Sequence, residues 1–151
     1  MSRRPTLVIF RGLPASGKTH QAREILHRAV AVGRRGRVMR VNRDDFRAMA
    51  LDHAYREPEG PTEDAVTVAT HAAIRALLVA GIDVICDDTN LHAEHVAVLV
   101  RLAVDTGAHY EIRDLTRTVS LGVCLRRDAL RSRPVGEQVI RAMHERLFRT
   151  A

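Results

Sequence analysis

Aromatic residues are scarce in this chain: they make up 3% of its 151 residues, and tryptophan is absent. Any binding that depends on stacking against rings must therefore rely on very few side chains. The sequence has no apolar run near the roughly 20 residues of a membrane span. Its first residues, MSRRPT, contain no apolar stretch typical of a signal peptide. We therefore expect a cytoplasmic protein with no membrane partner.

Cysteine, glycine and proline are also few, and their placement excludes several classes of protein. Cys86 and Cys124 form neither a Cys-x-x-Cys pair nor a zinc-ligand spacing, so we expect both to be reduced and structural. His92 and His95 lie one helical turn apart but lack a third ligand, so no zinc site is predicted. Five prolines, nine glycines and 46% hydrophobic residues argue against disorder. The length predicts one globular domain, residues 1–151.

Lysine is the rarest basic residue, and its one position is informative. The chain has 24 basic residues, of which only Lys18 is lysine, and its formal net charge is +6. Arginine is accepted at every other basic position, which suggests that position 18 requires a compact ammonium. Residues 41–95 carry an excess of acidic side chains between two basic flanks. This distribution suits an enzyme that handles phosphate with a metal ion, although solvated helix faces would give the same pattern.

Short apolar runs alternate with helical patterns and predict an α/β fold, a four-stranded parallel sheet with helices on both sides. The first strand, with the sequence TLVIF, has the texture of a central strand buried on both faces. Residues 51–60 are predicted to form a mobile loop. The predicted strands are 6–10, 37–41, 82–86 and 109–115; the predicted helices are 21–32, one from 43 with Asn42 as its cap, one from Thr62 to about 80, one capped by Asn90, 121–130 and 137–148. Ligand chemistry then belongs at the carboxyl ends of the strands.

The turn after the first strand carries the strongest chemical signal in the sequence. Residues 12–19, GLPASGKT, match Gly-x-x-x-x-Gly-Lys-[Ser/Thr] between a predicted strand and a predicted helix. Such a loop points backbone N–H groups at phosphates, which predicts an ATP or other NTP site. The residues expected to bind the nucleotide here are Gly12, Pro14, Ala15, Ser16, Gly17, Lys18 and Thr19. The Thr19 hydroxyl is expected to hold Mg²⁺.

The segment after the second strand, NRDDFR at residues 42–47, supplies candidate acceptor residues. A kinase needs a carboxylate that accepts the proton of the attacking hydroxyl, and Asp44 or Asp45 can do so. Both can instead cap the helix, and for Asp45, three residues after Asn42, capping is the favoured interpretation. Arg47 shares a helix face with Asp44 and can help to hold an acceptor.

Four motifs together resemble the bacteriophage-type polynucleotide 5′-kinases, the P-loop kinase module of end-healing repair enzymes. The motifs are GLPASGKT, NRDDFR, the DDTN of residues 87–90, and RDALR at 127–131 followed by Val135 and VIRAM. The resemblance covers nearly the whole chain, but the Asp-x-Asp-Gly phosphatase motif of many family members is missing. The resemblance, without that motif, therefore implies phosphorylation of 5′ ends without removal of 3′ phosphates.

The resemblance also implies roles for individual residues. Asp44 would be the general base, Arg47 would bind the phosphate next to the accepting nucleotide, and Asp88 would support the site. Arg131, with Arg127 as its partner, would act on the donor phosphates from a helical lid at about 119–135. An arginine-rich helix suits phosphoryl transfer, but such a face can also serve only to bind nucleic-acid backbone.

The leading hypothesis is therefore an enzyme that uses Mg²⁺ and ATP or another NTP to phosphorylate the 5′-OH end of a DNA or RNA polynucleotide. The alternatives are a small-molecule kinase of the same build, acting on a nucleoside, sugar or antibiotic, and a nucleotide-switched binding module. Phe46 and Tyr55 are the stacking candidates, with core packing the alternative for Phe46. Whether Asp87 or Asp88 supports the metal stays open.

Overall fold

The structure, a computed structural model, describes residues 3–51 and 61–149. Of the predicted loop at residues 51–60, residues 52–60, with the stacking candidate Tyr55, lie outside the described residues. The described strands are β1 (Thr6–Arg11), β2 (Val38–Val41), β3 (Asp83–Cys86) and β4 (His109–Asp114). The described helices are α1 (Lys18–Ala31), α2 (Arg43–Ala50), α3 (Pro61–Val79), α4 (Ala93–Asp105), α5 (Leu121–Ala129) and α6 (Glu137–Arg149). Among them, none is long and apolar enough to cross a bilayer.

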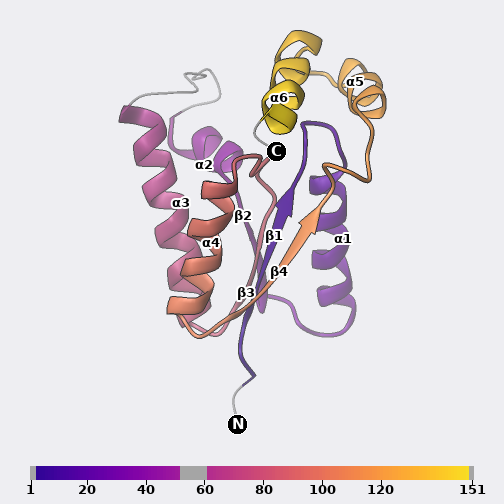
Figure 1. The fold of residues 1–151 in the computed structure, drawn as a ribbon. Coiled ribbons are helices and arrows are strands. Elements are labelled where there is room, and N and C mark those ends of the chain that lie inside the picture. The colour runs from indigo at the N-terminus through magenta and orange to yellow at the C-terminus, as the bar shows by residue number, and fades with distance from the viewer. Residues whose placement is uncertain (1–2, 52–60, 150–151) are drawn as a thin grey trace.

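The four strands form one parallel sheet in the order β2-β3-β1-β4 (Figure 1). The predicted α/β class and the central position of the first strand are confirmed. Alternation along β1 builds a core on each face of the sheet. Leu7 and Ile9 pack with α3 and α4, whereas Val8 and Phe10 pack with α1. Since all strands run in the same direction, their carboxyl ends meet at one edge.

A third, smaller core lies above that edge and joins the last two helices to the phosphate loop. Leu13 of the loop, Cys124 of α5 and Ile140 of α6 are buried against one another. In Figure 1, α5 and α6 lie together beyond the carboxyl ends of the strands, with α5 above the start of α1. The predicted lid region therefore covers the loop. Cys86 and Cys124 are both free and buried, as expected for structural thiols.

Three predicted helix starts are wrong. The first helix begins at Lys18, three residues earlier than predicted, because the turn of the phosphate loop leads directly into it. Asn90 does not cap α4, which begins at Ala93 after His92. Asn90 instead has a φ of +44°, and its amide donates to the carbonyl of Phe10 at 2.8 Å. Thr62 is not a cap either, because α3 already includes Pro61.

Candidate active site

The phosphate loop has the conformation that its glycines predict. Gly17, at the amino end of α1, has a φ of +104°, which a residue with a side chain rarely adopts. Gly12 has no room for one, since a Cβ there would lie 2.7 Å from Ser16 Oγ. No side chain caps the first N–H groups of α1 in the described residues. These N–H groups therefore remain available to an anion.

Lys18 lies inside this loop. Its Nζ donates to the carbonyls of Gly12 and Leu13 at 2.9 and 2.8 Å, and the side chain is buried. Burial lowers the pKa of Lys18 to about 8, against the opposing effect of Asp87 and more distant carboxylates. The ammonium is thus poorly solvated before any ligand arrives. A triphosphate would restore the charge pairing that water no longer supplies.

Asp87 lies directly beneath the loop, at the end of β3. Its Oδ2 accepts a hydrogen bond from Thr19 Oγ1 at 2.8 Å, and its Oδ1 accepts from Arg40 Nε and Asn42 Nδ2 at 2.8 and 3.0 Å. The side chain is 1% exposed. A hydroxyl beside a fixed carboxylate is a donor set that Mg²⁺ accepts, with water completing the coordination. No group of three or more His, Cys, Asp or Glu side chains suited to a metal occurs in the described residues.

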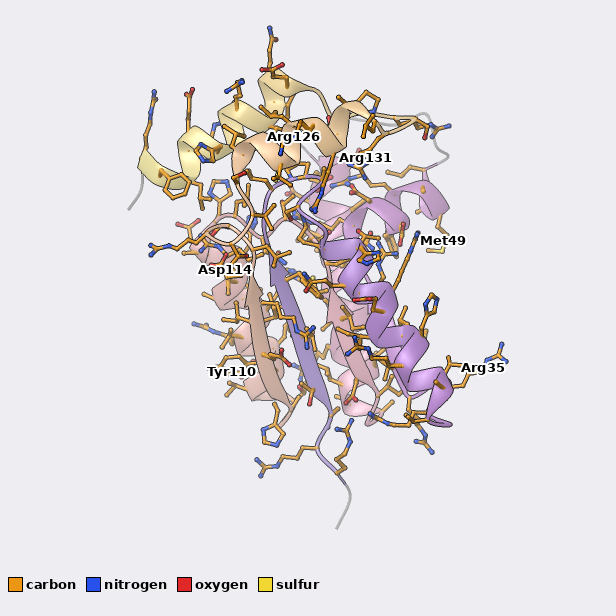
Figure 2. All side chains as sticks on the ribbon, turned by 90° about the vertical axis from the view of Figure 1, so that its right-hand side faces the viewer. Arg35, Met49, Tyr110, Asp114, Arg126 and Arg131 are labelled. Carbon is orange, nitrogen blue, oxygen red and sulfur yellow. The ribbon has the colours of Figure 1, made fainter. Side chains whose placement is uncertain are left out.

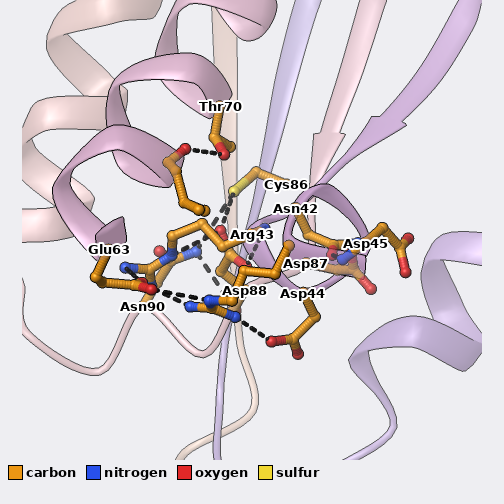
Figure 3. Close-up of polar contacts among 12 residues, drawn as sticks. Asn42, Arg43, Asp44, Asp45, Glu63, Thr70, Cys86, Asp87, Asp88 and Asn90 are labelled. Atoms are coloured by element: carbon orange, nitrogen blue, oxygen red, sulfur yellow. Dashed lines mark hydrogen bonds and ion pairs between the residues drawn. The ribbon is translucent and has the colours of Figure 1, made fainter. Parts of the chain in front are cut away.

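Asp88, the neighbouring carboxylate, turns to the other side of the strand end. It accepts from the backbone N–H of Arg43 at 3.0 Å, and its second oxygen lies 3.4 Å from Arg43 Nε (Figure 3). Burial raises the pKa of Asp88, while Arg43 acts to lower it. The two carboxylates therefore have different surroundings: Asp87 contacts the phosphate loop, and Asp88 anchors the start of α2.

Asp44 and Asp45 at the start of α2 also differ. Asp45 completes the cap, because its N–H donates to Asn42 Oδ1 at 2.8 Å and its carboxylate contacts the Asn42 amide. Asn42 is thus the capping side chain, while the Asp45 carboxylate bonds the Asn42 amide, pairs with Arg40 and does not line the cavity that Asp44 lines. The Asp44 side chain is 91% exposed, yet it lines the same cavity as Lys18. Its one ion pair in the described residues is with Arg47, at 2.5 Å.

Arg47 is held from two sides. Its Nε and Nη2 donate to the two carboxylate oxygens of Glu63 at 2.8 and 2.6 Å, while Nη1 contacts Asp44. The hydrogen bonds to Glu63 raise the pKa of Arg47 above its ordinary value. Glu63 also lies 3.7 Å from Arg43 Nη1. Glu63 belongs to α3, and no sequence pattern predicts its contact with the NRDDFR helix.

Helix α5 and the turn after it place two arginines near the loop. Arg127 Nη1 donates to the carbonyl of Ser16 at 3.4 Å. Arg131 lies in the turn after α5, where its Nη1 is 3.5 Å from Asp128 (Figure 2). Asp128 is buried and accepts from the N–H groups of Val135 and Gly136 at 3.1 and 2.9 Å. Although burial opposes it, these hydrogen bonds lower the pKa of Asp128. The turn that carries Arg131 is therefore fixed at its base.

One cavity of about 770 Å³ joins these parts. It is lined by the phosphate loop, the start of α2, the strand-end residues, and α5 with the segment that follows it. Its lining residues include Lys18, Thr19, Asp44, Arg47, Asp87, Asp88, Arg127, Arg131 and Arg133. The predicted residues thus come together at the carboxyl edge of the sheet. The stacking candidate Phe46 is half-buried and lines neither this cavity nor a second one described below.

A comparison with protein families matches residues 7–150 to an AAA domain model, AAA_33. The chain belongs to this AAA domain family. The family and the sheet order agree with a P-loop kinase fold, as the sequence predicted. A comparison with curated proteins finds no match.

Solved structures show the same fold. A Pnkp1/Rnl/Hen1 RNA repair complex matches with a TM-score of 0.79 and 24% identity over 99% of this chain and 46% of that chain. The Mycobacterium tuberculosis APS kinase CysC, in complex with AMPPNP and APS, matches with a TM-score of 0.68 and 21% identity over 84% and 70%. Chaetomium thermophilum Kti12, in complex with ADP-AlF3, matches with a TM-score of 0.63 and 22% identity over 94% and 78%.

These likenesses show a shared fold, which is found both in an APS kinase and in a protein of an RNA repair complex. The chain spans less than half of the matched chain in the RNA repair complex. The P-loop kinase fold supports phosphotransferase chemistry with a nucleoside triphosphate and, typically, Mg²⁺. The acceptor must be inferred from the site itself.

Proposed function

We propose that this AAA domain transfers the γ-phosphate of ATP or another NTP to the 5′-OH end of a DNA or RNA polynucleotide. The observation that carries the proposal is the open cavity in which Lys18, the exposed carboxylate Asp44 and the lid arginine Arg131 face a common space. A long acceptor needs an approach from solvent, and the exposure of Asp44 leaves one. Residues 1–151 would act as one kinase domain with a lid at about 119–135.

In this proposal Asp44 is the general base. Its carboxylate accepts the proton of the 5′-hydroxyl as that oxygen bonds to the γ-phosphorus and the bond to the leaving nucleoside diphosphate breaks. Arg47 fixes Asp44 through the 2.5 Å contact and is itself fixed by Glu63. The carboxylate is therefore oriented although it is exposed.

The donor phosphates are assigned to the loop and the lid. Lys18 would bind them as a point charge, and the backbone N–H groups of the loop, which Pro14 lacks, would bind them as dipoles. Arg127 and Arg131 would contact them from α5 and the turn after it. Thr19 would hold Mg²⁺ directly, and Asp87, through its contact with Thr19, would hold it through water. The ion, when bound, neutralises charge on the phosphates. This choice of Asp87 over Asp88 rests on their different contacts.

Arg47 and Asp88 are assigned to the acceptor side. Arg47 would bind the phosphate next to the accepting nucleotide, and Asp88 positions α2 through Arg43. The basic flanks of the sequence favour a polyanionic acceptor. The likeness to a protein of an RNA repair complex supports a nucleic-acid substrate. A cytoplasmic location stays a prediction.

A small-molecule kinase is the second candidate, because the fold is also that of an APS kinase. A smaller cavity beside Asp88 offers a site to an uncharged small acceptor such as a nucleoside or a sugar. A nucleotide-switched binding module is the third. It would hydrolyse ATP slowly, at a rate that no acceptor changes.

The test is incubation with ATP labelled in the γ-phosphate and a panel of 5′-OH DNA and RNA oligonucleotides, nucleosides and adenosine 5′-phosphosulfate. We expect label on the oligonucleotides, with binding that weakens steeply as salt rises. Label confined to a small molecule would establish the second candidate. Label released only as inorganic phosphate, at an acceptor-independent rate, would establish the third.

A further inference from the structure

A second cavity, of about 420 Å³, lies between α3 and α4 below the end of β3. It shares two lining residues with the nucleotide cavity, Arg43 and Asp88. Arg43 directly precedes the proposed base Asp44. A ligand that presents a hydroxyl to Asp44 therefore has this cavity beside it.

The charges around the second cavity disfavour an anion. Glu63, Asp64 and Asp88 line it, and the one arginine among its lining residues, Arg43, is already paired with Asp88 and Glu63. A phosphate or sulfate group would meet more carboxylates than cations, which costs free energy in a partly buried site. The floor is apolar and includes the buried Ile74 and Leu99. The site therefore suits a neutral group with a flat apolar surface.

Two histidines stand beside Thr67, Thr70 and Asn90 among the uncharged polar groups of this cavity. His71 of α3 is half-buried, and His95 of α4 lies at the exposed rim. Neither ring makes a side-chain hydrogen bond or an ion pair within the described part of the chain, although the His95 ring lies edge-on to that of His92 at 5.4 Å. Burial, and next the positive charge of Arg43, lowers the pKa of both rings, although Asp88 acts in the opposite direction on each. Each ring is therefore neutral at pH 7 and offers one donor and one acceptor.

Arg43 supplies a flat surface in a chain that has few aromatic rings. Its guanidinium lies between Asp88 and Glu63, which restrict its plane (Figure 3). A fixed guanidinium stacks on planar heterocycles, and stacked bases in nucleic-acid complexes use such planes. Phe46, which the sequence suggested for this purpose, does not line the cavity.

We infer that this second cavity receives the terminal nucleobase of the acceptor, stacked on the Arg43 guanidinium with its hydrogen-bonding edge toward His71 and His95. The inference rests on the proposed function and adds a base-binding site to it. Because the two histidines offer both donors and acceptors, the site accepts a base without selecting strictly among the four.

The experiment uses two 5′-OH oligonucleotides that differ only in the terminal nucleotide, which either carries its base or is abasic. We expect wild-type kcat/KM to be at least about tenfold higher for the base-bearing acceptor, given the typical strength of stacking. His71→Ala and His95→Ala are each expected to reduce this preference about fivefold. The matched control is His27→Ala, an exposed histidine on α1 outside both cavities.

The outcomes separate the inference from the proposed function. Equal use of the two acceptors by the wild type, or the wild-type preference in His95→Ala, would overturn the inference while transfer itself continues. No transfer to either acceptor would overturn the proposed function and the inference together. His71→Gln, which keeps a donor and an acceptor, should retain more of the preference than His71→Ala. Since His95 is exposed, its variant also serves if replacement of His71 prevents folding.

Discussion

The protonation of Lys18 gives a sharp test of the phosphate loop, because this is the chain's one lysine. Burial lowers its pKa from 10.5 to about 8 in the nucleotide-free protein. Bound phosphates favour the ammonium, so nucleotide binding should raise the pKa and take up a proton above pH 8. Affinity should consequently fall about tenfold per pH unit above pH 8, until the pKa of the complex is reached.

The effect of pH on folding stability is opposite in sign to its effect on nucleotide affinity. Between pH 8 and 10.5 the unfolded chain holds a proton on Lys18 that the folded chain has lost, so the contribution of Lys18 to stability rises with pH. The difference between the two pKa values corresponds to about 3 kcal/mol in total. The free energy of unfolding in urea is measured at pH 7 and pH 9.5 for the wild type and for Lys18→Met. The difference between the two proteins isolates the pH-dependent contribution of Lys18.

The direct assay is NMR of protein labelled with ¹³C in lysine. A single lysine Cε signal is expected, titrating near pH 8 without nucleotide and at a higher pH with ADP. Lys18→Met, which lacks the signal, confirms the assignment. A midpoint near 10.5 without nucleotide would refute the burial of the ammonium in the loop.

Three further predictions concern the loop, the acceptor side and the lid. Gly12→Ala should destabilise the fold by about 1–3 kcal/mol because its Cβ would overlap Ser16. Gly122→Ala, a helical position where a Cβ would meet only Arg126 Nη1 at an ordinary 3.5 Å, should stabilise the fold slightly in thermal unfolding. Arg47→Ala should raise the KM for acceptors with a phosphate beside the terminal nucleotide far more than it weakens ATP binding, and equal losses would contradict its role. Arg131→Lys should impair transfer nearly as much as Arg131→Ala in steady-state rates, and a wild-type rate would mean that charge alone suffices.

The fold and the phosphate loop were predictable because their signals are local. The TLVIF strand and the loop GLPASGKT follow each other directly, and both their positions and their conformation depend on neighbouring residues. The cap formed by Asn42 and Asp45 is local in the same way. The predicted cap at Asn90 is wrong, because asparagine favours both helix caps and positive φ. Here it has a positive φ, and its amide donates to the distant carbonyl of Phe10.

The acceptor side was only partly predictable because its contacts join distant segments. Glu63 lies 16 residues after Arg47, and no periodic pattern links them. The separate roles of Asp87 and Asp88 depend on which face of the strand end each side chain takes, which the contacts with Thr19 and Arg43 decide. The cavity that His71 and His95 help to line depends on how α3 and α4 pack together.

The most direct test of the central claim, that Asp44 serves the γ-phosphate of a nucleotide bound at Lys18, is single-turnover transfer to a 5′-OH oligonucleotide by the wild type and Asp44→Asn. We predict a loss of about 10²- to 10⁴-fold in the transfer rate, the usual contribution of a general base, with nucleotide affinity nearly as in the wild type. A transfer rate equal to that of the wild type would contradict the account.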